Sequence, residues 1–418
     1  MMLTTAPETR LSLAKAAARA VARLTSTEKS DALHAIADAL VVRSEEALAA
    51  NAEDVARGRD NGIGESLIDR LTLTPERVGA LAAATRDVAA LPDPVGEVVR
   101  GQRLANGIRL EQIRVPFGVV GAIYEARPNV TVDIAALALR SGNAVVLRGG
   151  SAAKSSNMVL VDIMRGALEG VGVTPEAIQT VDDFGRDGAR ALMHGRGLID
   201  VLVPRGSANL IETVVTESTV PVIETGAGNV HVVLDVTAPD DWAVDITVNS
   251  KTHRPSVCNS AESVLVVRDA AERLVPKVAR ALQEAGVTIH GDDEVQRLAA
   301  DVVPATEDDW ATEYLSLDIA MKVVDTLDEA IEHIDRYSTH HTETIVTTDS
   351  RSADRFLAEV DSAAVYVNTS TRFTDGGEYG FGAEVGISTQ KLHARGPMGL
   401  PELTSTKWIG RGAGQIRP

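Results

Sequence analysis

The feature that most constrains the fold is a regular alternation of short β-rich runs with helical stretches from residue 115 onward. The first series of runs is "GVVGAIYE", "GNAVVLRGG", "IDVLVPRG" and "VPVIETG". A second series begins near residue 230 with "VHVVLD", "AESVLVVRD", "AMKVVD", "TETIVTTD" and "AAVYVN". Parallel strands joined by crossover helices produce such an alternation. The sequence therefore predicts two α/β domains, in agreement with a length of 418 residues that exceeds one ordinary core.

The first ninety residues have a helical pattern instead. Thr25 and Glu28 have the spacing of a capping box, and Leu33, Ile36 and Leu40 follow at helical intervals. We expect a layer of helices here. Near the other end, the glycine-rich segment 374–388 is predicted to lack a regular element, and "LTSTKWIG" has a β-like pattern.

The composition excludes several classes of protein. The chain has 41 Lys and Arg residues against 59 Asp and Glu, which gives a net charge of −18. Because an acidic surface repels phosphate backbones at long range, we expect no nucleic-acid partner. No apolar run approaches the ~20 residues that span a bilayer, and "MMLTTAPETR" lacks an apolar signal core. With a single cysteine, which cannot form an internal disulfide, these features predict a cytoplasmic protein and no membrane partner.

Two turns have the form of phosphate-binding loops, because each follows a β-rich run, contains glycine and opens a helix. The first, "VLRGGSAAKSSN", contains Arg148, Gly149, Gly150, Ser151 and Lys154, and the second, "VPRGSANLIETV", contains Arg205, Gly206 and Ser207. Either turn alone is typical of ordinary Gly-Ser loops, and the pair together is less so. Neither matches G-x-G-x-x-G, so an ordinary Rossmann site is not supported.

Cys258 stands in "KTHRPSVCNSAES", where Lys251, His253 and Arg254 precede it. Most single cysteines are buried and inert. Neighbouring cations could instead lower the thiol pKa and produce the nucleophilic thiolate, although they could equally be solvated surface residues. Upstream, Glu224 ends the β-like run of "VIETGAGN" beside small residues, where a carboxylate could face a cleft.

The pairing of "IETGAGN" with a cysteine 34 positions after its glutamate (258 − 224 = 34) resembles the aldehyde dehydrogenase superfamily. Within it, the chain is most similar to the γ-glutamyl phosphate reductases, also called glutamate-5-semialdehyde dehydrogenases. That similarity runs from about residue 10 to the C-terminus. Its motifs are "VPFGVVGAIYEARPNVT", "SGNAVVLRGG", "VPRGSANLI", "VIETGAGN" and "EYGFGAEVGISTQKLHARGPMGL". The resemblance implies an aldehyde dehydrogenase-like fold with two doubly wound α/β domains and a small β oligomerisation arm.

The resemblance also implies site residues. Cys258 matches the family nucleophile, and Glu224 matches a carboxylate that often serves as general base. Gly206 and Ser207 match the loop beneath the cofactor pyrophosphate and nicotinamide. Arg148 stands where many relatives have a lysine that touches the adenosine ribose, and Glu313 where they have a glutamate for the nicotinamide ribose.

Two departures from the family pattern bear on function. Many relatives have an oxyanion-hole asparagine after a Pro-Trp pair, whereas this chain has "YEARPNV", in which Asn129 is the nearest candidate. Ser151 replaces a glutamate that NAD-preferring relatives place against the ribose hydroxyls. Without that carboxylate a 2′-phosphate is not repelled, and Arg148 or Lys154 could attract it, so we expect NADP(H) as the cofactor.

Other polar clusters give weaker signals. The adjacent His340 and His341 lack partners at metal-ligand spacing, so we expect a solvated loop and no metal. "STQKLHARGPMG" is an exposed basic turn or, in this context, a clamp for an anionic substrate. The candidate substrate-binding residues are Lys391, His393 and Arg395, with Arg127, Lys251 and Arg254 as further cations.

The resemblance implies NADPH-dependent reduction of L-glutamyl 5-phosphate to L-glutamate 5-semialdehyde and phosphate through a Cys258 thioester, the second step of proline biosynthesis. One alternative is a hydrolytic aldehyde dehydrogenase in which Glu224 activates water. The other is a non-catalytic cofactor-binding scaffold.

The expected domains are a cofactor-binding domain (1–226), interrupted by an arm strand at about 104–118, and a catalytic domain (227–395). The C-terminal part of the oligomerisation arm is expected at 400–418. The expected partners are the small-molecule substrate, glutamate 5-kinase, and further copies of the chain in a homodimer or higher homo-oligomer.

Overall fold

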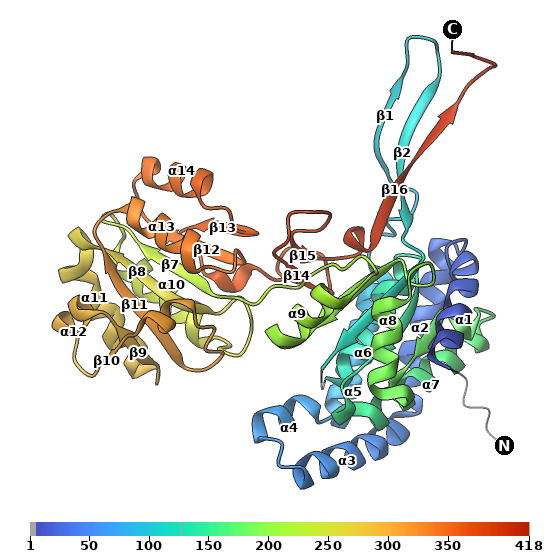
Figure 1. The fold of residues 1–418 in the computed structure, drawn as a ribbon, viewed down its shortest axis with the longest axis horizontal. Coiled ribbons are helices and arrows are strands. Elements are labelled where there is room, and N and C mark those ends of the chain that lie inside the picture. The colour runs from blue at the N-terminus through green and yellow to red at the C-terminus, as the bar shows by residue number, and fades with distance from the viewer. Residues whose placement is uncertain (1–5, 126, 418) are drawn as a thin grey trace. The chain divides into compact units, whose positions relative to one another are not determined.

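The computed structural model describes residues 6–125 and 127–417, and the chain divides into two compact units (Figure 1). Unit 1 comprises residues up to Glu224 together with Gly380–Gly386 and the segment from Met398 onward. Unit 2 comprises Thr225–Tyr379 and Ile387–Pro397. In the described residues, no helix is both long and apolar enough to cross a membrane.

Unit 1 contains a parallel four-stranded sheet with the order β5-β4-β3-β6. Its strands are β3 (Val119–Tyr124), β4 (Ala144–Arg148), β5 (Ile178–Thr180) and β6 (Val201–Arg205). Its helices are α1 (Pro7–Val21), α2 (Ser26–Val42), α3 (Ser44–Asp60), α4 (Glu65–Leu71), α5 (Pro75–Ala90), α6 (Pro128–Arg140), α7 (Lys154–Gly170), α8 (Gly185–His194) and α9 (Ala208–Glu217). Short 3-10 turns are η1 (Ser151–Ala153), η2 (Pro175–Ala177), η3 (Asp182–Phe184) and η6 (Pro401–Leu403).

Side-chain alternation explains how helices cover both faces of this sheet. Along β3, Val119 and Ile123 belong to a core cluster that also contains Leu11 of α1 and Leu192 of α8. Since successive side chains point to opposite faces, the other half of β3 faces away from this cluster. The predicted helical layer at the N-terminus is confirmed, and Thr25 and Glu28 form the expected capping box with reciprocal hydrogen bonds.

Unit 2 contains a seven-stranded parallel sheet with the order β10-β9-β11-β8-β7-β12-β13. Its strands are β7 (Val230–Leu234), β8 (Ala261–Val267), β9 (Thr288–Gly291), β10 (Val303–Pro304), β11 (Asp318–Val324), β12 (Thr342–Val346) and β13 (Ala364–Val367). Its helices are α10 (Asp240–Thr252), α11 (Arg268–Glu284), α12 (Asp293–Leu298), α13 (Leu327–Tyr337) and α14 (Ser350–Glu359), with 3-10 turns η4 (Glu307–Ala311) and η5 (Thr371–Phe373). Separate apolar clusters on the two faces, one against α11 and one against α13, make this sheet doubly wound.

A separate three-stranded antiparallel sheet with the order β1-β2-β16 belongs to unit 1, from which it projects in Figure 1. Its strands are β1 (Val98–Arg103), β2 (Arg109–Pro116) and β16 (Thr404–Arg411). The central strand β2 pairs with both others. The expected arm strands near 104–118 and beyond 400 are present, and β1 is an addition to them. A two-stranded sheet consists of β14 (Gly386–Ser388) and β15 (Gly396–Met398). Because β14 falls within the segment 374–388, the prediction that this segment lacks a regular element is wrong for its last three residues.

The α/β fold class is confirmed, but one expected strand is wrong. "VPVIETG" forms only an isolated bridge, between Val222 and Leu202. Its chain remains extended to Gly228, where it enters β7 through Asn229. This extended connection matters for the site described next.

Candidate active site

Cys258 lies in the loop of residues 253–260, which joins α10 to β8 and is called the Cys258 loop below. The side chain is half-buried. Within the loop, the Ser260 N–H donates to the carbonyl oxygen of Val257 at 3.0 Å. The Ser260 hydroxyl lies 3.2 Å from the carbonyl oxygen of Lys251 and 3.3 Å from that of Ser250. These bonds tie the segment after the thiol to the last turn of α10.

The extended connection that follows Glu224 packs directly against the cysteine backbone. A Cβ atom built on Gly228 would lie 1.5 Å from the Cys258 carbonyl oxygen, a separation that real Cβ atoms do not show. Gly228 is therefore required by close approach rather than by its own φ. The sequence proposed a pairing of "ETGAGN" with Cys258, and unit 2 brings the Gly228 end of that motif to the cysteine.

Glu313 is joined to the same place. Its Oε1 accepts a hydrogen bond from the Gly228 N–H at 2.7 Å. Burial raises the pKa of the Glu313 carboxyl, while the Gly228 N–H and Lys251 act in the opposite direction. The carboxylate predicted to hold a ribose is thus held, in this structure, beneath the Cys258 loop.

Lys251 does not have the position of a substrate-binding cation. Both Lys251 and Glu262 are fully buried, and the Lys251 Nζ lies 2.6 Å from the Glu262 carboxylate. Burial raises the pKa of Glu262 to about 7, against the opposing effect of Lys251. The expectation that Lys251 binds an anionic substrate is corrected, because the buried Lys251 forms an ion pair with Glu262 of β8.

The turn η5 braces the Cys258 loop from the other side. The Thr371 hydroxyl donates to the Asn259 carbonyl oxygen at 2.7 Å, and the Asn259 amide donates to the Thr374 carbonyl oxygen at 2.7 Å. The Thr371 N–H also donates to the Ser250 hydroxyl at 3.2 Å. No sequence motif pointed to η5, because these partners lie more than 110 residues apart in the chain.

The expected anion clamp of Lys391, His393 and Arg395 is partly neutralised. Lys391 and Arg395 both form ion pairs with Asp361 and lower the pKa of its carboxyl to about 2. His393 is exposed and has a positive φ of 70°. An anion at this turn would have to compete with the Asp361 carboxylate, so this turn is no longer our first candidate for anion binding.

In unit 1, the turn after β4 rests on a buried polar network. The Gly149 N–H donates to the Asp182 carboxylate at 2.7 Å, and the Asn157 amide reaches the same carboxylate at 3.1 Å. A Cβ on Gly149 would collide with the Asn157 amide nitrogen at 1.9 Å. Burial raises the pKa of Asp182 to about 6. These contacts fix the shape of the turn from below.

The exposed side of this turn carries the residues predicted to recognise a 2′-phosphate. Ser151 and Lys154 are exposed, and Arg148 is half-buried with its Nε atom shielded from solvent and lacking a hydrogen-bond partner among the described residues. An orphaned guanidinium nitrogen beside an exposed lysine fits a ligand that brings phosphate oxygens.

The turn between β6 and α9 already holds a carboxylate. The Glu125 carboxylate accepts hydrogen bonds from the Ser207 N–H at 2.9 Å and from the Ser207 hydroxyl at 2.8 Å. A Cβ on Gly206 would lie 2.8 Å from the same carboxylate. Gly206 and Ser207 therefore form a cradle suited to anionic oxygens, in which Glu125 stands where a cofactor phosphate could bind.

The remaining predicted catalytic residues occupy different surroundings. Asn129 lies in the first turn of α6 and its amide donates to Asp133 at 3.1 Å. Because the amide already has an acceptor, its proposed role at an oxyanion remains a prediction. Arg127 is the exposed N-cap residue of α6, and Glu224 is half-buried in the extended segment after the Val222 bridge.

The adjacent His340 and His341 were expected to lie in a solvated loop, and the structure differs from this expectation. His341 is fully buried, its Nδ1 lies 2.8 Å from the Thr342 hydroxyl, and burial lowers its pKa to about 4. His340 has a positive φ of 58°. The expectation is therefore wrong for His341, which is a core residue of unit 2.

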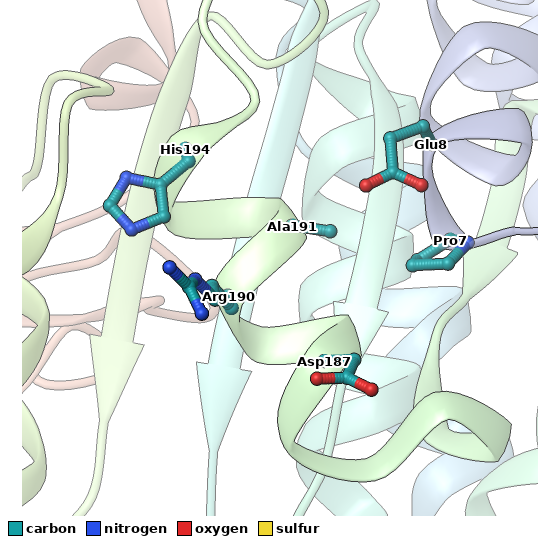
Figure 2. A pocket seen from close by; sticks show the side chains of 6 residues that line it. All are labelled: Pro7, Glu8, Asp187, Arg190, Ala191 and His194. Atoms are coloured by element: carbon teal, nitrogen blue, oxygen red, sulfur yellow. The ribbon is translucent and has the colours of Figure 1, made fainter.

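One cavity of unit 1 lies away from the predicted site residues. Figure 2 shows a cavity of about 350 Å³ beside α1 and α8, lined by Pro7, Glu8, Asp187, Arg190, Ala191 and His194. None of the predicted site residues lines it. This cavity therefore does not support any of the predicted sites.

Known proteins share both the sequence and the fold. The model of the aldehyde dehydrogenase family matches residues 6–300. A γ-glutamyl phosphate reductase of Clavibacter michiganensis subsp. michiganensis is 64% identical over 407 residues, which are 97% of this chain and 94% of that protein. One from Leifsonia xyli subsp. xyli is 62% identical and covers 98% of this chain and 97% of its own length. The crystal structure of γ-glutamyl phosphate reductase from Thermotoga maritima aligns with a TM-score of 0.97 at 44% identity, over 99% of this chain and 100% of that one.

Proposed function

The chain belongs to the aldehyde dehydrogenase family and, within it, to the γ-glutamyl phosphate reductases, and on this premise we propose that it reduces L-glutamyl 5-phosphate to L-glutamate 5-semialdehyde and phosphate. This is the second step of proline biosynthesis from glutamate. The observation that carries the proposal is the identity of 64% over nearly the full length of a reductase with that name. The reaction class agrees with a lone half-buried cysteine whose backbone is fixed by Gly228 and η5.

Cys258 carries the covalent chemistry in this proposal. Its thiolate attacks the acyl carbon of the substrate, the bond from that carbon to the phosphate oxygen breaks, and phosphate leaves with the electron pair. A thioester remains on Sγ. After hydride has been delivered, the tetrahedral thiohemiacetal collapses to the aldehyde and the thiolate is restored. The adduct that forms before phosphate leaves and the thiohemiacetal are both tetrahedral and carry an oxyanion. Each needs hydrogen-bond donors aimed at that oxyanion, and the Cys258 N–H is our first candidate.

The enzyme uses a nicotinamide cofactor, which supplies the hydride when it is bound. We propose that it is NADPH. The turn from Arg148 to Lys154 offers two cations and no carboxylate at Ser151, while the Gly206–Ser207 cradle offers backbone and hydroxyl donors. A 2′-phosphate would be attracted by the first set, and the pyrophosphate would use the second after displacing Glu125.

The two units receive different roles in the proposal. Unit 1 binds the cofactor through its four-stranded sheet, and unit 2 holds the reacting thiol. The residues 1–226 and 227–395 remain the proposed extents of these functions, with 400–418 in the arm. We also propose a cytoplasmic homo-oligomer assembled through the arm, and glutamate 5-kinase as the source of the acyl phosphate.

The test is an assay of semialdehyde oxidation with NADP, glutamate 5-semialdehyde and phosphate, each omitted in turn. The proposed enzyme requires all three, whereas a hydrolytic aldehyde dehydrogenase with Glu224 as its base turns over without phosphate. Cys258→Ser should abolish turnover while NADPH binding persists. Substantial activity in that variant would remove Cys258 from the mechanism, and failure to turn over at all would favour the scaffold alternative.

A further inference from the structure

One cation beside the thiol has no assigned role so far. Arg372 lies at the centre of η5, the turn whose flanking residues Thr371 and Thr374 bond to Asn259 in the Cys258 loop. The anchoring bonds come from both ends of η5, so the position of the Arg372 backbone relative to Cys258 is fixed. The side chain is half-buried, and its Nε donates to His253 Nδ1 at 3.2 Å.

Arg372 lies among charges of both signs. Burial lowers the pKa of the Arg372 guanidinium, and Arg254 lowers it further, whereas Asp375, Cys258 and Glu378 act to raise it. In the described residues, neither Arg372 nor Arg254 forms an ion pair with a carboxylate. By contrast, Lys391 and Arg395 share Asp361. Within the described residues, the two arginines therefore have no carboxylate partner, whereas Lys391 and Arg395 both have one.

A purely structural arginine would be expected to donate to carboxylate or carbonyl oxygens, as the buried Arg140 donates to the carbonyl oxygens of Leu91 and Ser26, because a partly desolvated guanidinium is costly without acceptors. Arg372 instead donates to an imidazole nitrogen. A His253 Nδ1 that accepts a hydrogen bond keeps its ring proton on Nε2, so the imidazole presents a second donor. Two guanidiniums and an N–H donor next to a thiol form a receptor for an oxyanion with several oxygens.

We propose that Arg372, with Arg254 and His253, binds the phosphate group of the acyl phosphate as it leaves and as it returns in the reverse reaction. The proposal rests on the proposed function. Phosphate is bonded to the very carbon that Sγ attacks, whereas three carbons separate that carbon from the α-carboxylate. Cations adjacent to the thiol therefore meet the phosphate first. In the forward direction they stabilise the electron pair that phosphate takes from the broken carbon–oxygen bond.

The kinetic test uses semialdehyde oxidation with phosphate as the varied substrate. Arg372→Gln should raise KM for phosphate about ten- to a hundred-fold, since a charge-assisted contact is worth ~1.5 to 3 kcal/mol, and should leave KM for the semialdehyde nearly unchanged. Arg372→Lys keeps the charge but loses the two-pronged geometry. Its KM for phosphate should therefore lie between that of the wild type and that of Arg372→Gln. Arg351→Gln, which removes an exposed charge from α14, is the matched control and should behave as wild type.

A second measurement does not depend on turnover. Inorganic phosphate should slow alkylation of Cys258 by iodoacetamide in the wild type and in R351Q, and this protection should be lost in R372Q. If R372Q raises only the KM for the semialdehyde, Arg372 binds the α-carboxylate and the proposal is overturned. It is also overturned if both KM values of R372Q are unchanged and phosphate still protects its Cys258 from iodoacetamide. If wild-type oxidation needs no phosphate, the proposed function itself has failed, which is a separate result.

Discussion

Ser151 is the residue on which the choice of cofactor depends in our proposal. It is exposed at the start of η1, in the same turn as Arg148 and Lys154. Ser151→Glu places a carboxylate beside those cations, so it should repel a 2′-phosphate and weaken NADPH at least tenfold while affecting NADH much less. Fluorescence titration with both cofactors measures this, and Ser12→Glu on α1 is the control for added charge. Equal losses for the two cofactors would show that the turn does not reach the 2′-phosphate.

Glu125 is expected to compete with the cofactor. Its carboxylate occupies both donors of Ser207 and lies against Gly206. Glu125→Gln removes the negative charge, so NADPH should bind several-fold more tightly if its pyrophosphate uses those donors. Isothermal titration against Glu212→Gln, which neutralises an exposed carboxylate on α9, isolates the effect. Unchanged or weaker binding in E125Q would mean that the pyrophosphate binds elsewhere.

At the scale of elements, the extended connection into β7 sets the position of the thiol. Gly228→Ala would force apart the connection and the Cys258 loop, because the added carbon meets the Cys258 carbonyl oxygen. A displacement of about 1 Å at a reacting group can cost ~100-fold in rate, so kcat should fall by that order. Gly170→Ala at the end of α7, where a Cβ has open space, is the control. Wild-type kcat in G228A would refute the required close approach.

The element beneath the Cys258 loop is the buried pair of Lys251 on α10 and Glu262 on β8. Lys251→Met leaves the Glu262 carboxylate buried alone, and breaking such a pair costs ~3 to 5 kcal/mol of the free energy of unfolding. Replacing both residues by Met should cost less than the two single changes together. Urea unfolding is followed by tryptophan fluorescence in a Trp408→Phe background. The remaining tryptophans, Trp242 and Trp310, both belong to unit 2, so the signal reports on that unit. Lys277→Met, which breaks an exposed pair with Asp240, should change the free energy of unfolding far less, because exposed ion pairs contribute little. Additive losses would contradict the coupling.

Local patterns predicted most of these elements, and long-range contacts explain the rest. The β-rich run "AESVLVV", for example, forms β8 as predicted. Nothing in that run indicated that its Glu262 pairs with the buried Lys251 on α10. The short strands β5, β9, β10, β14 and β15 were not predicted, because two to four residues carry too little periodicity. Cys258 was found from its motif. Arg372 was not, because η5 meets the Cys258 loop only through contacts across more than 110 residues.

The same limit explains the corrected cations. A basic residue near a thiol in sequence looks available, and only the fold shows whether a carboxylate neutralises it. Lys251 forms an ion pair with Glu262, and Lys391 and Arg395 both form ion pairs with Asp361. In a chain with a net charge of −18 such neutralisation is the expected outcome for most cations. Arg254 and Arg372, which form no ion pair with a carboxylate among the described residues, are therefore the more informative exception.

At the scale of the whole molecule, the arm requires a partner surface. In the part of the chain that the structure describes, β1 and β16 each pair only with β2, so both outer edges keep open backbone donors and acceptors. Val98 pairs with Ile113, and Trp408 pairs with the neighbouring Gln112. Successive residues of a strand face opposite sides, so Val98 and Trp408 lie on opposite faces of the arm. They are 54% and 47% exposed, which shows that this unit covers neither face.

We predict from this exposure that the protein is at least a dimer and that the arm forms the contact. The double variant Val98→Lys/Trp408→Lys places a charge on each face, and desolvating those charges in an interface is costly, so it should dissociate toward the monomer. Light scattering over a dilution series measures the change in mass. Val42→Lys, at an 82% exposed position of α2 outside the arm, adds one charge and should keep the wild-type mass. A wild type that is monomeric at every workable concentration, or a double variant with an unchanged dissociation constant, would show that the arm serves another purpose.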